Sequence, residues 1–382
     1  MNRTSSHWTS PLITPKVLPT HVDVAIIGAG IAGCSAALEL HKAGVSFALL
    51  EQQESLGTGI SSREIGHSKL GLGDNPARLH SSLGTTITQD ILQYTYENSL
   101  WLVEQGFALH RGGLYIAKNK AEGMELQQSA AILTELQWDI TPWTAQQVNA
   151  HFQSKDLYNG YFHPHDVSYS PTQFFTHCNR LHENIVTACQ VLDIRSADTL
   201  KLHTSRGDIS CEVIIVANNS HAGILEDFFS EKISPVRLQT ISVPSAQQRL
   251  PAHCQFGYIQ WRDIDNIRLI SGCRWGTPHL EIGESDDSIL SPQIGAHLRR
   301  FAETTFGIRD NPLLEWTGIM GFSCDGLPMI GPLPGTSDIL ACCGFSGNQS
   351  ALGFRAGRSM ARLILHGKDL ALPSCFLPSR FL

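Results

Sequence analysis

The chain has 382 residues, enough for two domains or one large one, and its 42% apolar and 16% charged content is typical of a globular protein with a substantial core. A formal net charge of −7 gives no sign of a basic surface that would bind a polyanion, so no nucleic-acid partner is expected. The ten cysteines include no C-x-x-C spacing, which predicts reduced, mostly buried thiols in a cytoplasmic protein.

The start of the chain, residues 1–20, is polar and holds three prolines, which predicts an extended N-terminal arm and no signal peptide. The apolar run from Val24 to Leu40 is interrupted by three glycines and contains Glu39. A buried strand followed by a helix explains this run better than a membrane span does, so no transmembrane segment is expected.

The segment from Val22 to Gln52 combines the features of a dinucleotide-binding unit. Its predicted elements are a buried strand (Val22–Ile27), a glycine turn, a helix (Ile31–Ala43) and a second strand (Ser46–Leu50) that ends at Glu51. The G-x-G-x-x-G spacing is formed by Gly28, Gly30 and Gly33. These glycines allow a tight turn, close approach of a pyrophosphate and close packing of helix on strand, while the helix N-terminus attracts the phosphates. A glycine-rich turn in an unrelated α/β protein would not explain Glu51, which is placed to bind ribose hydroxyls.

The glycine- and serine-rich loop after Glu51 follows a strand, and such loops hold ligands in open α/β sheets. Its candidates to face a cofactor are Ser61, Ser62, Arg63 and His67. Further along, helices are predicted over 87–105, 121–136 and 144–152, with a hairpin around Gly112–Gly113.

The stretch from Tyr161 to Tyr169 contains His163, His165 and Asp166. It is predicted to be a polar extended loop and no metal site is expected, because a closed site needs three or four converging ligands and Pro164 separates the two histidines. A helix over 172–184 is predicted to follow.

Strands are predicted at 185–194, 200–204 and 211–218, and the last of them is a continuous apolar run typical of a buried parallel strand. The nucleotide-binding domain is therefore predicted to be built from separated segments. Residues 236–308 change to strands joined by polar turns and a helix over 292–305, which predicts an inserted antiparallel-sheet domain. The chain ends with a strand (338–343), a glycine turn and a helix (351–366), whose positive N-terminus can stabilise negative charge on a nearby ring.

Four sequence islands together resemble the D-amino-acid-oxidase-type flavoprotein superfamily, in particular its amine-oxidising branch of glycine/sarcosine oxidase-like and γ-glutamylputrescine oxidase-like enzymes. The islands are HWTSPLITPKVLPTHVDVAIIGAGIAG, SSREIGHSKLGLG, ISPVRLQTISVP, and EWTGIMGFSCDGLPMIGPLPG through GFSGNQSALGFRAGRSMARL. They span nearly the full chain in order. The resemblance implies an α/β fold in which a discontinuous FAD-binding Rossmann-like domain carries an inserted antiparallel-sheet substrate domain. After the arm, the expected FAD-binding domain comprises 21–98, 160–235 and 312–382, and the expected substrate domain 99–159 and 236–311.

The resemblance implies noncovalent FAD and assigns its contacts residue by residue. Gly28, Gly30 and Gly33, with Ile31 and Ala32, would hold the pyrophosphate, and Glu51 with Gln52 the adenosine ribose. Ser61, Ser62, Arg63 and His67 would lie along the diphosphate and flavin, and the Val191 backbone would meet adenine. The residues implied near the flavin pyrimidine are Gly344, Phe345, Ser346, Gly347, Asn348 and Gln349.

Several positions depart from the family pattern. Ile319 stands where an arginine clamps the substrate carboxylate in glycine- and D-amino-acid-oxidising relatives, which favours an amine or an amino acid held by another residue. Gly318 stands where a cysteine bonds flavin covalently in sarcosine-oxidising relatives, and Cys324 is offset from that place. An apolar residue near Ile270 replaces a lysine that activates oxygen in some relatives. Asn218 and Asn219 replace the usual A-T-G turn.

The implied reaction oxidises the C–N bond of an amine or amino acid to an imine by hydride transfer to flavin N5, followed by hydrolysis. Arg237 is interpreted as structural. O2 or another acceptor would take the electrons from a small-molecule substrate. An NAD(P)-linked oxidoreductase on the same nucleotide fold and a flavin-binding protein without catalysis stay as alternatives. The candidates for substrate contact or catalysis are His67, Tyr258, Trp261, Arg268, Trp275 and Gln349.

Overall fold

The computed structural model describes residues 6–196, 199–273 and 281–382, and the contacts among them form two units. Unit 1 consists of 63–170 and 237–319 together with Ser6 and His7. Unit 2 consists of 8–62, 171–236 and 320–382. Each unit therefore contains segments that are far apart in the chain, as predicted for a domain interrupted by an insertion.

The limits of the units differ from the predicted domain boundaries at several places. Residue 236 falls in unit 2 and residues 312–319 fall in unit 1, and three larger segments also change sides. Residues 63–98 belong to unit 1, because β3 (His67–Ser68) is a strand of its sheet. Residues 160–170 belong to unit 1 for the same reason, since they contain β6 (Gly160–Tyr169). Residues 8–20 of the predicted arm belong to unit 2, where the Ile13 amide donates to the Glu54 carbonyl.

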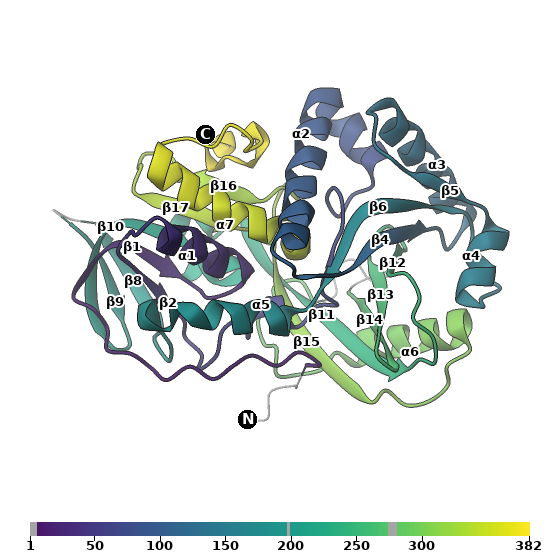
Figure 1. The fold of residues 1–382 in the computed structure, drawn as a ribbon, viewed down its shortest axis with the longest axis horizontal. Helices are drawn as coiled ribbons and strands as arrows, with labels where there is room; N and C mark the ends of the chain where they lie inside the picture. The colour runs from purple at the N-terminus through teal and green to yellow at the C-terminus, as the bar shows by residue number, and fades with distance from the viewer. Residues whose placement is uncertain (1–5, 197–198, 274–280) are drawn as a thin grey trace. The chain divides into compact units, whose positions relative to one another are not determined.

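Unit 2 is built on a sheet with the strand order β16-β17-β10-β1-β2-β7 (Figure 1). All neighbours in this order are parallel except β16 and β17, which are antiparallel. Outside this order, β9 pairs antiparallel with β10 on one side and with β8 on the other. The strands are β1 (His21–Ile27), β2 (Phe47–Leu50), β7 (Ile185–Val186), β8 (Val191–Ser196), β9 (Leu200–Thr204), β10 (Gly207–Val216), β16 (Met329–Pro332) and β17 (Ile339–Cys343). The helices are α1 (Ile31–Lys42), α5 (Pro171–Cys178) and α7 (Gln349–His366), with short 3-10 turns η1 (Ile60–Ser62), η2 (Asn179–Asn184), η3 (Asn219–Ile224), η4 (Asp227–Phe229), η5 (Ser374–Phe376) and η6 (Pro378–Phe381).

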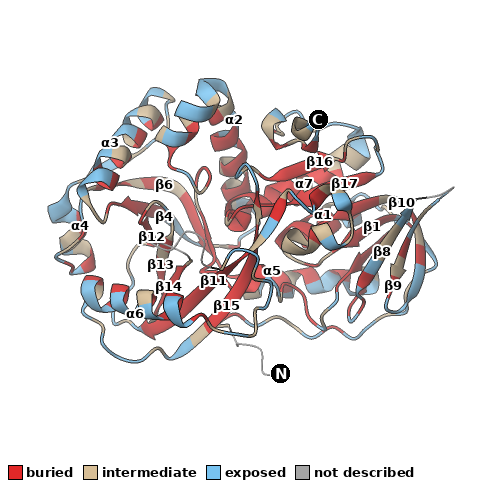
Figure 2. Cartoon of the chain, turned by 180° about the vertical axis from the view of Figure 1, so that it is seen from behind, coloured by how far each residue is buried: buried red, intermediate tan, exposed pale blue. Residues whose placement is uncertain are grey.

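The central strands of this sheet are apolar because both of their faces are covered. β2 and β17 are buried at every residue, and the last four residues of β1 are buried as well. β17 is drawn as buried in Figure 2. The predicted strand–helix–strand unit over residues 22–52 is thus confirmed, and so is the α/β class.

Unit 1 is built on a largely antiparallel sheet with the order β15-β11-β14-β13-β12-β4-β6-β3, to which β5 adds beside β6. Its remaining strands are β4 (Ala108–Ile116), β5 (Thr141–Trp143), β11 (Ile233–Pro244), β12 (Ala252–Cys254), β13 (Ile259–Ile264), β14 (Ile267–Gly272) and β15 (Leu314–Ser323). Its helices are α2 (Pro76–Glu104), α3 (Lys120–Glu135), α4 (Ala145–Phe152) and α6 (Pro292–Phe306). The antiparallel sheet expected for the inserted region is therefore present.

Two local predictions in unit 1 are wrong. The hairpin at Gly112–Gly113 does not form, because β4 continues through both glycines and pairs with β6 on either side of them. The stretch over 161–169 is strand β6 rather than a loop, and the register jumps from Arg111↔Val167 to Gly113↔His163. Residues 164–166 bulge out of the ladder there, so Pro164 needs no ladder hydrogen bond.

Other helix and strand limits also differ from the prediction. α2 begins at Pro76, earlier than predicted, and is interrupted at Gly84, whose φ is +79°. α5 ends at Cys178 and continues as the 3-10 turn η2. Within the described ranges, no helix is both long enough and apolar enough to cross a membrane.

Candidate functional site

The ends of the parallel strands in unit 2 carry the residues that the motif predicts. Because β1, β2, β10 and β17 are parallel, the residues that follow them meet at one edge of the sheet. Gly28 follows β1 with φ +100°, and a Cβ there would lie 2.9 Å from the Ala217 carbonyl oxygen. Glu51 follows β2, and its carboxylate accepts from the Ala29 and Gln53 amides at 2.9 Å each. Glu51 therefore fixes the glycine turn from the neighbouring strand.

Helix α1 begins at this edge with its N-terminus open. Its N-cap is Gly30, which offers no side-chain cap, and the Ile31 amide donates to Ser61 Oγ at 3.1 Å. Gly33 lies against the turn, since a Cβ there would be 2.0 Å from the Gly28 carbonyl oxygen. The helix start thus approaches the strand as closely as the motif predicts, and its amides point toward the edge where an anion would sit.

Helix α7 places a second open N-terminus at the same end. Its N-cap Asn348 makes no side-chain cap bond. A Cβ on Gly353 would lie 3.0 Å from Ile31 Cγ2, and one on Gly357 would lie 2.2 Å from the Ala32 carbonyl oxygen. Later residues of α7 therefore meet later residues of α1, so the two helices lie side by side and run in the same direction (Figure 1). The positive ends of both helix dipoles therefore face the same way.

The turn from Gly344 to Asn348 joins β17 to α7 and is held by side chains. Asn219 Oδ1 accepts from the Gly344 amide at 3.0 Å, and Ser346 Oγ accepts from the Ser323 amide at 3.1 Å. The Asn348 amide group donates to the carbonyls of Phe345 and Ser346, while its Oδ1 is buried and has no hydrogen-bond partner among the described residues. A buried acceptor of this kind is one that a ligand's donor can satisfy.

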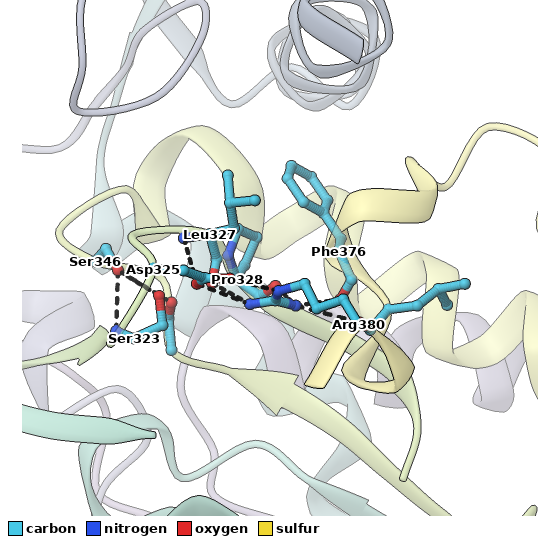
Figure 3. Close-up of polar contacts among 9 residues, drawn as sticks. Ser323, Asp325, Leu327, Pro328, Ser346, Phe376 and Arg380 are labelled. Atoms are coloured by element: carbon cyan, nitrogen blue, oxygen red, sulfur yellow. Dashed lines mark hydrogen bonds and ion pairs between the residues drawn. The ribbon is translucent and has the colours of Figure 1, made fainter. Parts of the chain in front are cut away.

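Arg380 holds the loop from Asp325 to Pro328 beside this turn (Figure 3). Its guanidinium binds both carboxylate oxygens of Asp325, at 2.7 and 3.1 Å, and donates to the carbonyls of Leu327 and Pro328. Although burial acts to raise the pKa of the Asp325 carboxyl, the Arg380 contacts hold it below its usual range. Sequence reasoning missed Arg380, because nothing near it in the chain marks a partner 55 residues away.

Unit 1 contains a buried polar cluster formed by His67, Asp166 and His253. His67 Nε2 lies 3.4 Å from Asp166 Oδ2, and the His67 and His253 ring centroids are 5.1 Å apart. Burial lowers the pKa of His67, and it lowers that of His253 well below its usual value. Apart from their 3.4 Å contact with each other, His67 Nε2 and Asp166 Oδ2 have no hydrogen-bond partner among the described residues, and His253 Nε2 has none either. The sequence prediction had placed Asp166 in a polar loop, and His253 carried no signal of its own.

The predicted substrate contacts lie in several different settings. Trp261 is fully buried against Phe152 and Phe301, at ring-centroid distances of 5.2 and 5.7 Å, so it is a core residue. Arg268 binds Asp263 through two nitrogens at 2.7 and 2.9 Å, which leaves its guanidinium engaged by the protein. Tyr258 is half-buried in the turn between β12 and β13. Trp275 lies outside the described residues.

The predicted cofactor contacts also differ in their surroundings. Arg63 belongs to unit 1, where it donates to the Thr317 carbonyl at 2.8 Å. Gln52 is exposed, while Gln349 is buried in the first turn of α7. The predicted strand over 185–194 is divided into β7 and β8, and Val191 is the first residue of β8. The Val186 carbonyl accepts from the Glu51 amide at 3.0 Å. Ser62 is buried at the end of η1.

Comparison with protein families finds a match over residues 23–363 to the family described as "DAO: FAD dependent oxidoreductase". Among curated relatives, the tRNA 5-methylaminomethyl-2-thiouridine biosynthesis bifunctional protein MnmC of Legionella pneumophila (strain Lens) is 25% identical over 325 residues, or 81% of this chain and 45% of that protein. Human mitochondrial sarcosine dehydrogenase is 21% identical over 384 residues, or 92% of this chain and 40% of that protein. The chain therefore spans less than half the length of these relatives.

Solved structures share the fold at lower identity. Glycine oxidase from Geobacillus kaustophilus has a TM-score of 0.80 at 19% identity, with 95% of this chain and 100% of that chain covered. The L-amino acid deaminase from Proteus myxofaciens has a TM-score of 0.79 at 15% identity, with 100% of this chain and 98% of that chain covered.

Proposed function

Because the chain belongs to the DAO family of FAD-dependent oxidoreductases, we propose that it oxidises the C–N bond of an amine or amino acid. FAD, when bound, supplies the acceptor for the hydride that leaves the carbon next to nitrogen, and water then hydrolyses the resulting imine. The proposal places the protein in the amine-oxidising part of the family. It leaves the NAD(P)-linked alternative without support, since the family match is to flavin enzymes.

The observation that carries the proposal is the edge of the unit 2 sheet. Two parallel helices with open N-termini suit a pyrophosphate. Helix α1 packs closely on the glycine turn at Gly33, and α7 packs closely on α1 at Gly357; neither position has room for a side chain. Glu51 lies at the end of β2, where ribose hydroxyls bind in such folds. Asn348 adds a buried acceptor for a ligand donor. The residues present therefore fit FAD, which we expect to be bound without a covalent link.

We propose further that the substrate is an amine rather than an α-amino acid held by a carboxylate clamp. The position of the clamp arginine of some relatives is Ile319, which is buried and apolar. Within the described part of unit 1, each buried arginine is already engaged by the protein. These arginines are Arg63 with Thr317 and Asp287, Arg237 with Glu281 and Asp286, Arg262 with the carbonyls of Ile65, Gly66 and Tyr169, and Arg268 with Asp263. None of them offers a free bidentate anchor.

The charge of the chain bears on the kind of substrate that carries the amine. A net charge of −7 gives no basic surface for a nucleic-acid backbone, so we propose a small-molecule amine rather than one attached to a polynucleotide. All ten cysteines are free thiols, which favours a reducing compartment such as the cytoplasm. Ile270, at the place of the oxygen-activating lysine of some relatives, is buried in β14, so the acceptor can be O2 or another oxidant.

The test uses α-amino acids paired with their decarboxylated amines, for example sarcosine with dimethylamine and glycine with methylamine. The purified protein is mixed with each compound without oxygen, and bleaching of the flavin absorbance is followed. We expect the amine of a pair to bleach the flavin at least as fast as its acid. Faster bleaching by the acids would overturn the amine assignment, and no bleaching by any compound would leave a flavin-binding protein without catalysis. Peroxide measured in air identifies O2 as acceptor.

Arg380→Ala is expected to weaken FAD binding about tenfold, or about 1.4 kcal/mol. The substitution removes the guanidinium that ties the loop over 325–328 to the C-terminal segment, beside the Ser323–Ser346 contact. The dissociation constant of FAD is measured by titrating apoprotein and following flavin fluorescence. Arg309→Ala, at an exposed arginine of unit 1, is the control and should leave the constant unchanged. Equal constants for both variants would refute the role of Arg380.

A further inference from the structure

The cluster in unit 1 has the composition of a metal site. We propose that His67, Asp166 and His253 bind one divalent transition-metal ion through His67 Nε2, Asp166 Oδ2 and His253 Nε2. Within the described residues, these donor atoms all lie within 4.8 Å of one another, and all three residues are buried. The proposal departs from the expectation, drawn from the sequence, that the protein has no metal site. It does not depend on the amine oxidation proposed above.

The three donor atoms point to a ligand because the protein leaves them unsatisfied. Each lacks a hydrogen-bond partner among the described residues, although the side chains of His67 and Asp166 are fully inaccessible. Buried polar atoms are nearly always paired in folded proteins, so three unpaired atoms side by side call for a shared partner. Two imidazoles and one carboxylate form the donor set that Zn²⁺ and Fe²⁺ use.

Neighbouring groups already orient the ligands as metal sites require. His67 Nδ1 lies 3.1 Å from Ser168 Oγ, so an Nδ1–H can donate to the serine while Nε2 faces the ion. The Leu70 amide donates to Asp166 Oδ1 at 2.9 Å, which leaves Oδ2 for the ion. Such outer contacts fix the tautomer and the direction of a metal ligand.

The backbone of β4 leaves the space that these ligands occupy. A Cβ on Gly113 would lie 2.5 Å from Asp166 Oδ2 and 2.8 Å from His67 Nε2. Gly113 pairs with His163 of β6, next to the bulge that displaces Asp166 from the ladder. A site of this kind thus joins β3, β6 and β12 across segments that are far apart in the chain.

The distances allow an ion after a small adjustment. Zinc bonds of about 2.0–2.2 Å place tetrahedral ligand atoms roughly 3.4 Å apart, so a pair at the 4.8 Å limit has to close by roughly 1.4 Å. We expect the His253 side chain, whose ring lies against those of His67 and Tyr115, to make this movement when the ion binds. A cavity of about 10 Å³ that His253 lines with Lys69 and Tyr115 has room for about one water.

The donor set selects the kind of ion. Two of the three donor atoms are imidazole nitrogens and one is a carboxylate oxygen. Lys69, a basic residue, lines the small cavity that His253 also lines. The ion must therefore gain strongly from imidazole nitrogen, which disfavours Mg²⁺ and Ca²⁺ and favours Zn²⁺ or Fe²⁺.

Zn²⁺ binding to the flavin-loaded protein tests the proposal. The protein is stripped with a chelator, titrated with Zn²⁺ by calorimetry, and its zinc content is measured after gel filtration. We expect one zinc per chain and a higher melting temperature with the ion than without it. His253→Leu and Gly113→Ala should each weaken binding at least tenfold, the second without removing a ligand. His110→Ala removes an exposed histidine of β4 and should bind zinc as the unaltered protein does.

X-ray absorption on the zinc-loaded, unaltered protein keeps the proposal testable even where a variant fails to fold. Two imidazole nitrogens and a carboxylate oxygen at about 2.0–2.2 Å are expected around the metal. A protein that retains no zinc, a shell with sulfur or without imidazole, or equal binding by the unaltered and His253→Leu proteins would each overturn the proposal.

Discussion

Gly357→Ala is expected to destabilise the protein and to abolish retention of FAD. The added methyl group would lie 2.2 Å from the Ala32 carbonyl oxygen and 2.8 Å from the Ala36 amide nitrogen. Both are backbone atoms of α1, so they cannot rotate away and the two helices have to separate. Overpacking of this kind costs roughly 1–3 kcal/mol or more, which exceeds the gain of about 1 kcal/mol that alanine gives over glycine within a helix.

Gly353→Ala is the matched control, because it lies one turn earlier in α7 and faces the same helix. Its methyl group would meet Ile31 Cγ2 at 3.0 Å, and that side-chain atom can move. The control should therefore keep its FAD and melt within a few degrees of the unaltered protein, whereas Gly357→Ala should melt at a temperature lower by on the order of 5 °C. Thermal unfolding followed by circular dichroism, with the FAD-to-protein absorbance ratio, measures both effects. If the two variants behave alike, close packing of α1 on α7 does not set the cofactor site.

The nucleotide edge of unit 2 could be predicted from sequence because its determinants are local. Gly28, Gly33 and Glu51 lie within one strand–helix–strand unit, and their spacing encodes the turn, the helix packing and the acidic strand end that the structure contains. The parallel partner strands can be recognised in the sequence as continuous apolar runs, such as the end of β10.

The polar cluster of unit 1 could not be predicted in this way. His67, Asp166 and His253 come from three strands, and their meeting depends on the pairing of β3 with β6 and of β12 with β4. Asp166 reaches the cluster because β6 bulges at this residue. The alternation of apolar and polar residues in a strand sequence does not reveal such a bulge. The ion pair of Arg268 could not be predicted for a related reason. Its partner Asp263 lies across a hairpin, and the pair forms only once β13 and β14 are in register.

Asp369→Asn is expected to lower the free energy of unfolding by about 3–5 kcal/mol at neutral pH. The Asp369 carboxylate accepts from Arg355 at 2.7 and 3.0 Å and from Ser359 at 2.7 Å, and the Arg355 side chain is fully buried. The substitution removes the carboxylate charge that Arg355 contacts through two nitrogens. Asp310→Asn, at an exposed aspartate with no ion pair among the described residues, should change the free energy little.

The loss should shrink in acid, and its pH range distinguishes an ion pair from a packing defect. Burial acts to raise the pKa of the Asp369 carboxyl, but the contacts with Arg355 and Ser359 hold it well below its usual range. A carboxyl with a lowered pKa in the folded state stabilises it fully above its unfolded pKa of about 3.9, and that contribution is lost as the pH falls below this value. Urea unfolding of both proteins between pH 7 and pH 3 should therefore give a difference that is constant down to about pH 5 and then decreases. A difference that stays constant down to pH 3 would mean that the asparagine disturbs packing rather than charge, and that Arg355 is neutralised by another group.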